Sequence, residues 1–187
     1  MLLDENGKLV VAGVTFYGSS ADYRNLVFRL NPNGSFDNSF NTNGRFEFKT
    51  DSVNTISSIA KDANNRIILG GSSALNLGSS KMTFHRLNTN GSLDQTFNPG
   101  GVYKLSWGFD ASVQQVLLQT DGKIVGVGKV TGIAGNFDKI GILRLISNNT
   151  SGIPLYNEDT EVSVFPNPTT NSITIHAPNT ITGFTIY

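Results

Sequence analysis

The residues of this 187-residue chain with the clearest chemical potential are an arginine and an aspartate that recur together. Arg29 precedes Asp37 by eight positions, and Arg86 precedes Asp94 by the same eight. Three roles are open to the carboxylate: capping a short helical turn through backbone N–H groups two or three residues on, pairing with the arginine, or binding a ligand. We expect the cap, because a phenylalanine follows each aspartate by three residues and makes the segment a compact turn.

Metal, cofactor and catalytic sites are not predicted. The chain has no Cys, which excludes disulfides, thiolate zinc sites, iron–sulfur clusters and Cys nucleophiles. His85 and His176 have no third ligand at a suitable spacing, so we expect structural roles for both. The turns DENG and TDG lack the alternating ligands and the closing Glu of a calcium loop. No GxSxG elbow occurs, whereas a carboxylate pair for glycoside hydrolysis stays open, since such pairs meet only in the fold.

Composition limits the partners that the chain can bind. Its 14 Lys and Arg balance 14 Asp and Glu, so no basic field is present to hold a nucleic acid or an anionic membrane. The apolar runs are far shorter than the ~18 residues of a membrane span, and the start MLLDENGK does not have the pattern of a signal peptide. Trp107 offers a stacking platform for a sugar, although we expect it in the core or at a rim.

The arginine and the aspartate belong to an internal repeat. The segment from Phe28 to Arg45 returns from His85 to Val102 without gaps, at a separation of 57 residues. A second marker, a turn such as Asn-Gly followed by an apolar run, starts at Asn6 and recurs at Asn65 and Asp121. The chain therefore holds two nearly complete units and most of a third.

Each unit contains four short predicted strands. The first, such as Val53 to Ala60, is rich in β-branched and hydroxyl residues, although its spacing also fits a helical face. The second is a continuous apolar run, typical of a strand buried on both faces, and ends in small residues such as Gly13, Gly71 and Gly128 that let backbones approach closely. The fourth alternates apolar and charged residues, as in RFEFKT. This order predicts an all-β fold of tandem four-stranded propeller-like blades. Three repeats of about 57 residues make an open or incomplete propeller, because closure normally takes four or more blades.

The repeat resembles the delta-60 repeats of bacterial propeller proteins. The resemblance rests on LNPNGSFDNSF and LNTNGSLDQTF with their preceding apolar strands, and it covers residues 2–146, so we assign 1–146 to three such repeats. The third copy departs from the pattern, because ISNNTSGI follows Leu145 and Gly152 stands where an aspartate would follow Arg144. The resemblance implies structural roles for the repeated motif residues Arg29, Gly34, Asp37, Phe40, Arg86, Gly91, Asp94 and Phe97.

A different pattern follows a predicted linker at residues 147–160. Residues 161–187 contain two alternating strands around a double-proline turn, VSVFPNPTTNSITI, and this segment closely resembles the start of the carboxy-terminal sorting domain of type IX secretion cargo in Gram-negative bacteria. The sorting motif comprises Val164, Phe165, Pro166, Asn167 and Pro168. The resemblance implies a partial, truncated immunoglobulin-like β-sandwich, recognition by the type IX secretion machinery, and a secreted or outer-membrane-surface location.

The functional hypothesis is a secreted or surface-anchored propeller that binds a protein or glycan ligand, without catalysis of its own. The competing class is an extracellular polysaccharide-degrading enzyme or its carbohydrate-binding module, since a fold does not determine a function. We further expect the chain to be a fragment of a longer protein with more repeat copies upstream. Met1 to Leu3 align with the end of a first strand. Upstream sequence would supply the fourth strand of the last blade, so the strand Ile140 to Leu145 should find no such partner in residues 146–160.

Overall fold

The structure is a computed structural model. It describes residues 1–4, 6–18, 22–75, 79–132 and 138–145, together with the backbone of residues 163–165 and 174–176. The chain divides into two units, Met1–Thr150 and Ser151–Tyr187. In the described part, no helix has the length and hydrophobicity that crossing a membrane requires.

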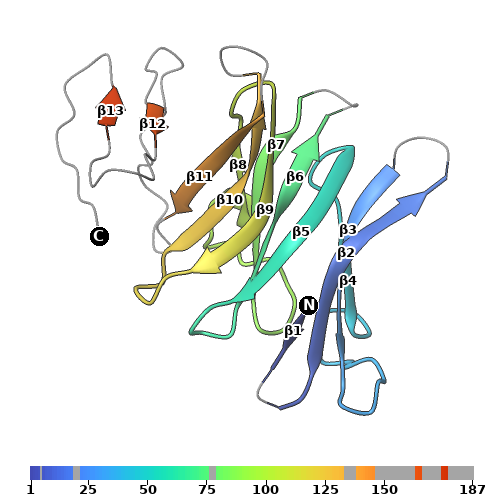
Figure 1. Cartoon of the computed structure of the whole chain (residues 1–187). Coiled ribbons are helices and arrows are strands. Elements are labelled where there is room, and N and C mark those ends of the chain that lie inside the picture. The colour runs from blue at the N-terminus through green and yellow to red at the C-terminus, as the bar shows by residue number, and fades with distance from the viewer. Residues whose placement is uncertain are drawn as a thin grey trace. The chain divides into compact units, whose positions relative to one another are not determined.

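The first sheet, blade 1, consists of four antiparallel strands in chain order (Figure 1). The strands are β1 (Leu2–Leu3), β2 (Leu9–Tyr17), β3 (Asp22–Leu30) and β4 (Arg45–Phe48). Leu2 pairs with Val10, which confirms that the first residues of the chain form the end of a first strand.

The second and third sheets repeat this order. Blade 2 comprises β5 (Val53–Lys61), β6 (Ile67–Ala74), β7 (Lys81–Leu87) and β8 (Val102–Leu105), with the 3-10 turn η1 (Pro99–Gly101) before its last strand. Blade 3 comprises β9 (Asp110–Leu118), β10 (Ile124–Thr131) and β11 (Lys139–Leu145). The first segment of blades 2 and 3 is a strand along its whole length, which excludes the helical interpretation of its spacing.

The hydrophobic core lies between the sheets, in two clusters. One cluster joins blades 1 and 2 and contains Val10, Val27, Phe40, Ile67, Leu69 and Leu87. The other joins blades 2 and 3 and includes Ile68, Met82, Phe84, Val113, Val116 and Ile124. Because side chains alternate along a strand, β6 directs Ile67 and Leu69 into the first cluster and Ile68 into the second.

The prediction that every second strand is buried on both faces holds only for blade 2. Strand β6 is buried along almost its whole length, whereas β2 and β10 contain many partly exposed positions. The physical reason is the number of neighbours: β6 has a sheet on each side, while blades 1 and 3 contact one other sheet each among the described residues. The sheets therefore form an open array of propeller-like blades, as predicted.

The structure describes only part of blade 3 and only part of the C-terminal unit. Blade 3 has the strand order β11-β10-β9 in the described residues, and residues 146–160 lie outside them, so the origin of its fourth strand stays a prediction. In the C-terminal unit, β12 (Ser163–Phe165) and β13 (Thr174–His176) pair antiparallel, with Val164 opposite Ile175. The remainder of the expected sandwich lies outside the described residues.

Glycines in the middle of the second strands allow two backbones to approach closely, and the strands continue beyond the small residues at which the sequence predicted their end. A Cβ atom added at Gly71 would lie 2.0 Å from the Thr55 carbonyl oxygen, and one at Gly128 would lie 1.8 Å from the Ser112 carbonyl oxygen. Both glycines lie beside an irregularity in the pairing with the first strand. The expected close approach is confirmed in blades 2 and 3, whereas a Cβ atom at Gly13 of blade 1 would have open space around it.

Replacing Gly128 by Ala is expected to lower the free energy of unfolding by about 1–3 kcal/mol. The added methyl group would overlap backbone atoms, and no side-chain rotation can relieve that overlap. The matched control is Gly13→Ala, at the same register position of blade 1. Its methyl group meets nothing within 4 Å, so its stability should be unchanged or slightly higher. Urea unfolding of both variants measures the difference, and equal effects would contradict the close backbone approach.

Two asparagines buried on the blade 1 and blade 2 strands have opposite hydrogen-bonding states. Asn54 accepts hydrogen bonds at Oδ1 from the backbone amides of Thr50 (3.0 Å) and Asp51 (3.1 Å), and its Nδ2 donates to the carbonyl oxygens of Tyr23 and Asp51. Asn25 is fully buried on β3, and neither its Oδ1 nor its Nδ2 has a partner in the part of the chain that the structure describes. Burying the Asn25 side chain therefore costs free energy of desolvation. At Asn54 the hydrogen bonds compensate for that cost.

We expect Asn25→Leu to raise the free energy of unfolding by about 1–3 kcal/mol, since it removes two buried polar groups without partners and keeps the branched shape of the side chain. The site tolerates an apolar side chain, because Met82 is buried at the matching position of blade 2. Asn54→Leu, the control, should lower stability by leaving backbone groups unpaired. Thermal and urea unfolding report both changes, and a less stable Asn25→Leu variant would refute the argument.

Candidate functional site

Each repeated aspartate lies in a tight turn after the third strand of its blade and uses its two oxygens differently. In blade 1, Oδ1 of Asp37 accepts hydrogen bonds from the backbone amide (3.1 Å) and the hydroxyl (2.7 Å) of Ser39. Oδ2 accepts from Nε of Arg29 and from Nζ of Lys8, both at 2.7 Å. One carboxylate therefore caps the turn and pairs with two cations at once.

Blade 2 repeats this arrangement. Oδ1 of Asp94 accepts hydrogen bonds from the amide (3.0 Å) and the hydroxyl (2.6 Å) of Thr96. Its Oδ2 accepts from Nε of Arg86 at 2.7 Å and from Nη1 of Arg66 at 3.4 Å. The predicted cap is present, and the ion pair that competed with it in the sequence is present too, because the carboxylate offers one oxygen to each. The capped amide belongs to a turn in both blades, not to a helix.

The environment of both aspartates lowers their pKa. Burial alone would raise the pKa of Asp37, but hydrogen bonds from Lys8 and Ser39 and from the neighbouring guanidinium outweigh it and hold the pKa far below its ordinary value. At Asp94, burial is outweighed by the hydrogen bonds from Thr96 and by the adjacent guanidinium charge, and the pKa is again lowered. The two carboxyls are therefore fixed negative charges.

An aromatic ring completes each ion-pair cluster. The guanidinium carbon of Arg29 lies 4.7 Å from the ring centre of Phe40, and that of Arg86 lies 4.7 Å from the ring centre of Phe97. Both rings are buried. Each arginine is thus held by a carboxylate and by the face of an aromatic ring, an arrangement that its planar cation favours.

The two glycines of the motif occupy the same turn in blades 1 and 2, and the turn of Gly91 lies at the seam between the blades. Gly34 and Gly91 have positive φ angles of 84° and 83°, which glycine adopts without steric cost. A Cβ atom at Gly91 would lie 2.7 Å from the Phe40 ring, so this turn of blade 2 packs directly on blade 1. Asn41 strengthens the contact: its backbone amide donates to the Asn90 carbonyl oxygen (2.6 Å) and its Nδ2 to the Gly91 carbonyl oxygen (2.9 Å).

A polar groove of about 340 Å³ opens beside this seam. Arg29 crosses the seam and donates from Nη1 to the Thr89 carbonyl oxygen of blade 2, at 2.8 Å. An adjoining cavity of about 230 Å³ shares part of the same lining. The seam groove, as we name it, is lined by Asp4, Asn6, Lys8, Arg29, Ser39, Thr89 and Asn90.

The groove presents mainly hydrogen-bond donors and amide groups to a ligand. Two carboxylates lie at or beside the groove. Asp37 is hydrogen-bonded within the ion-pair cluster described above. Asp4 stabilises its own turn by accepting hydrogen bonds from the backbone amides of Asn6 (2.9 Å) and Lys8 (2.8 Å). A polar ligand rich in hydroxyl or carbonyl groups matches this lining.

The second cation of each cluster was missed in the sequence. Lys8 and Arg66 each follow the turn before a second strand, and Lys123 occupies this position in the third unit. A basic residue at the same place in three units is the signal that identifies the position. In blade 3, Lys123 pairs with Asp121 inside its own turn. Position 152, which matches the repeated aspartate, lies outside the described residues.

His85 has a structural role, as expected. It is buried on β7, its Nε2 lies 2.7 Å from Oγ1 of Thr50, and its ring meets Phe48 edge-on at 5.0 Å. Burial lowers the pKa of His85 to about 3, so the ring is neutral near pH 7. Trp107 packs against the core between blades 2 and 3, also as expected. No group of three His, Cys, Asp or Glu suited to a metal ion occurs in the described part of the chain.

A second polar network near His85 was not predicted. Oδ2 of Asp51 accepts from Oγ of Ser73 at 2.6 Å and from Nζ of Lys104 at 2.8 Å. Ser73 is buried and also lies 2.9 Å from Oγ1 of Thr83. The network ties the segment between blades 1 and 2 to the strands of blade 2, which is a structural function.

The sorting motif falls only partly within the described residues. Val164 and Phe165 belong to β12, where they pair with β13. Pro166, Asn167 and Pro168 lie outside the described residues, and so does the predicted double-proline turn.

The four-stranded antiparallel blades, their constant spacing and the repeated turn cluster define the class of the molecule, a β-propeller repeat protein. Residues 5–40 and 63–97 match the model of a family described as "Domain of unknown function (DUF5122) beta-propeller". The two matches end at Phe40 and Phe97, the ring residues of the first two clusters, so they are successive copies of the repeat. Comparison with curated proteins gives no match.

Proposed function

We propose that this β-propeller serves a secreted or surface-anchored protein, binds a protein or glycan ligand without catalysis of its own, and is exported by the type IX secretion machinery. The observation that supports binding is the seam groove, in which amide, hydroxyl and cationic groups from two blades converge. Such clefts between packed units are common binding sites. Export is supported by the resemblance of the tail to a sorting domain.

The state of the carboxylates favours binding over glycoside hydrolysis. A glycosidase needs one carboxylic acid with a raised pKa and one carboxylate free to act as base or nucleophile. Beside the seam groove, Asp37 has a lowered pKa and both of its oxygens accept hydrogen bonds. Asp4, which lines the groove, accepts hydrogen bonds from its own turn. These contacts are typical of residues with a structural role in the walls of a groove.

The binding role is tested with a glycan array and a peptide display screen on the 187-residue chain, combined with a hydrolysis screen on polysaccharides. Asn6→Ala, which changes an exposed groove residue, should weaken the binding that is found. Asn64→Ala is the matched control, because it lies 58 residues on, at the same turn position of blade 2, and does not line the groove. If the chain hydrolyses a polysaccharide and loses this activity when one groove carboxylate is replaced, the competing hypothesis of a polysaccharide-degrading enzyme would be favoured instead.

The export route is tested by adding a cleavable export signal before Met1 and expressing the chain in a Gram-negative host with a type IX system. The double variant Pro166→Ala, Pro168→Ala should accumulate in the periplasm, since it loses the two prolines from which the sequence predicts a stiff turn in the sorting motif. Pro154→Ala, in the preceding linker, is the matched control and should reach the surface. Equal surface exposure of both variants, or of a chain truncated after residue 160, would reject this route.

A further inference from the structure

Two side chains on opposite walls of the seam groove hold their own turns with one polar atom and leave the other atom without a partner. Asp4 accepts two backbone amides at Oδ1, and its Oδ2 has no hydrogen-bond partner in the described part of the chain. Asn90 accepts at Oδ1 from the amide (3.0 Å) and the hydroxyl (2.8 Å) of Ser92, and its Nδ2 donates to no described residue. The groove therefore offers an acceptor on its blade 1 wall and a donor on its blade 2 wall.

Two cations of the groove are fixed in place by their own contacts. Nζ of Lys8 bonds Oδ2 of Asp37, and an ammonium group carries three N–H donors, so two donors remain. Arg29 donates from Nη1 to the Thr89 carbonyl oxygen at 2.8 Å and from Nη2 to Oγ of Ser39 at 3.2 Å. Side chains that are already ordered lower the entropic cost of binding a ligand.

The charges at the groove balance. Lys8 and Arg29 both pair with Asp37, and Asp4 adds a second carboxylate. A charged ligand of either sign would therefore meet one group that attracts it and one that repels it. A hydroxyl group both donates and accepts, so adjacent hydroxyls of a neutral sugar ring satisfy the carboxylate and the cations together.

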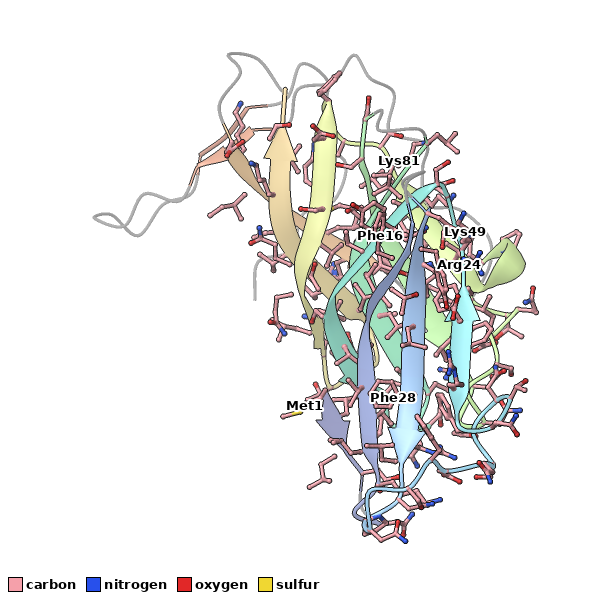
Figure 2. The ribbon with its side chains drawn as sticks, turned by 90° about the vertical axis from the view of Figure 1, so that its right-hand side faces the viewer. Met1, Phe16, Arg24, Phe28, Lys49 and Lys81 are labelled. Carbon is pink, nitrogen blue, oxygen red and sulfur yellow. The ribbon has the colours of Figure 1, made fainter. Side chains whose placement is uncertain are left out.

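The lining also favours a sugar over a peptide. Peptides are commonly bound along an exposed sheet edge, in an apolar groove or by an arginine cluster. The seam groove is lined by polar side chains, mostly from turns, and its one arginine is paired with Asp37. Figure 2 shows an aromatic ring and three cations toward the end of the sheets opposite Met1, and none of them lines the groove: Phe16, Arg24, Lys49 and Lys81.

The corresponding turn of blade 2 shows what leaves the acceptor available. Asp62, 58 residues after Asp4, accepts two backbone amides at Oδ1 in the same way, at 2.9 Å each. Its Oδ2, however, accepts from Nε of Arg66 at 2.7 Å. Blade 1 has Lys8 at this place, and the ammonium group pairs with a different carboxylate. The residue at this one position therefore determines whether the turn presents a carboxylate oxygen.

We propose that the seam groove binds a neutral sugar residue of a glycan through two adjacent hydroxyl groups. Oδ2 of Asp4 accepts a hydrogen bond from this pair of hydroxyls, and Nζ of Lys8 and Nδ2 of Asn90 donate to it. The inference rests on the binding function proposed above and narrows its ligand to a neutral glycan.

The test starts with an array of neutral oligosaccharides, oligosaccharides that contain uronic acids, and peptides, probed with the 187-residue chain. We expect neutral oligosaccharides to bind. Isothermal titration with the neutral oligosaccharide that binds most tightly then measures the variants. Asp4→Asn should weaken binding about 10- to 100-fold, because Oδ1 still holds the turn while an NH₂ group replaces the acceptor.

Lys8→Arg should weaken binding to a similar extent, because blade 2 shows that an arginine at this place occupies the carboxylate oxygen. Asn90→Asp, on the other wall, keeps Oδ1 for its turn and removes the donor, so it should also weaken binding. Arg66→Lys is the matched control: it makes the reverse change at the same turn position of blade 2 and lies outside the groove, so the affinity should not change. Circular dichroism and thermal unfolding establish which variants fold, and the folded ones decide the test.

The outcomes separate this inference from the proposed function. Binding of peptides but of no neutral oligosaccharide would overturn the inference and leave the binding function intact. Binding of a neutral oligosaccharide that the folded groove variants do not weaken would assign the glycan to another surface and would also overturn it. Tighter binding of the oligosaccharides with uronic acids would contradict a groove of balanced charge. A chain that binds nothing on the array would reject both the inference and the proposed function.

Discussion

Replacing Asp94 by Ala is expected to lower the free energy of unfolding by about 3–5 kcal/mol, the cost of leaving one charge of a buried ion pair without its partner. The Arg86 side chain is 2% exposed, and Oδ2 of Asp94 is the carboxylate oxygen that its Nε contacts at 2.7 Å. The same substitution removes the acceptor of the Thr96 amide and hydroxyl. Urea unfolding followed by circular dichroism measures the loss.

The corresponding change in blade 1, Asp37→Ala, should cost less, about 1–3 kcal/mol, because both of its cations reach water. The Arg29 side chain is 15% exposed and that of Lys8 is 28% exposed. Asp94→Asn separates the two roles of the carboxylate, since it retains the acceptor for the turn and removes the charge. Asp121→Ala, in an exposed pair of blade 3, should have little effect. A loss at Asp94 no larger than that at Asp37 would show that burial of the arginine does not set the cost.

Between about pH 6.5 and pH 3, His85 should make the chain progressively less stable as the pH falls, by up to about 1.4 kcal/mol per pH unit. Burial lowers the pKa of His85 to about 3 in the folded chain, against the ordinary value of 6.5 for histidine. In this range the unfolded chain takes up a proton and the folded chain does not, so acid favours unfolding. Lys104 opposes protonation and Asp51 favours it, and Thr50 bonds the ring nitrogen.

The measurement is the free energy of unfolding of the wild type and of His85→Gln at a series of pH values. Glutamine keeps a hydrogen-bonding group for Thr50 and does not titrate, so the difference between the two proteins isolates the histidine. The carboxyls of Asp37 and Asp94 titrate in both proteins and cancel in this difference. The difference should be constant above pH 7 and should then shift in favour of His85→Gln as the pH falls. Parallel curves down to pH 4 would contradict a neutral, buried His85.

The cluster at the repeated turns shows where prediction from sequence stops. The sequence identifies Arg29, Asp37 and Phe40 as one motif, because the three recur at constant spacing in the second unit. It does not reveal Lys8 as the second cation, since Lys8 and Asp37 are 29 residues apart and meet only when β2 pairs with β3. Nor can it show that the cap and the ion pair coexist, because that depends on the direction of each carboxylate oxygen.

Local chemistry determined the strands, the turns and their order in this protein. Alternating or continuous apolar runs separated by Asn-Gly turns define strands through backbone hydrogen bonding, and a 57-residue repeat forces the same order on each blade. Only the tertiary structure decided which of these apolar positions are buried. Phe84 and Ile142 occupy the same register position, yet Phe84 is buried beneath blade 3 and Ile142 is exposed. Burial is a property of two surfaces in contact, so it follows from the neighbouring blade and not from the strand itself.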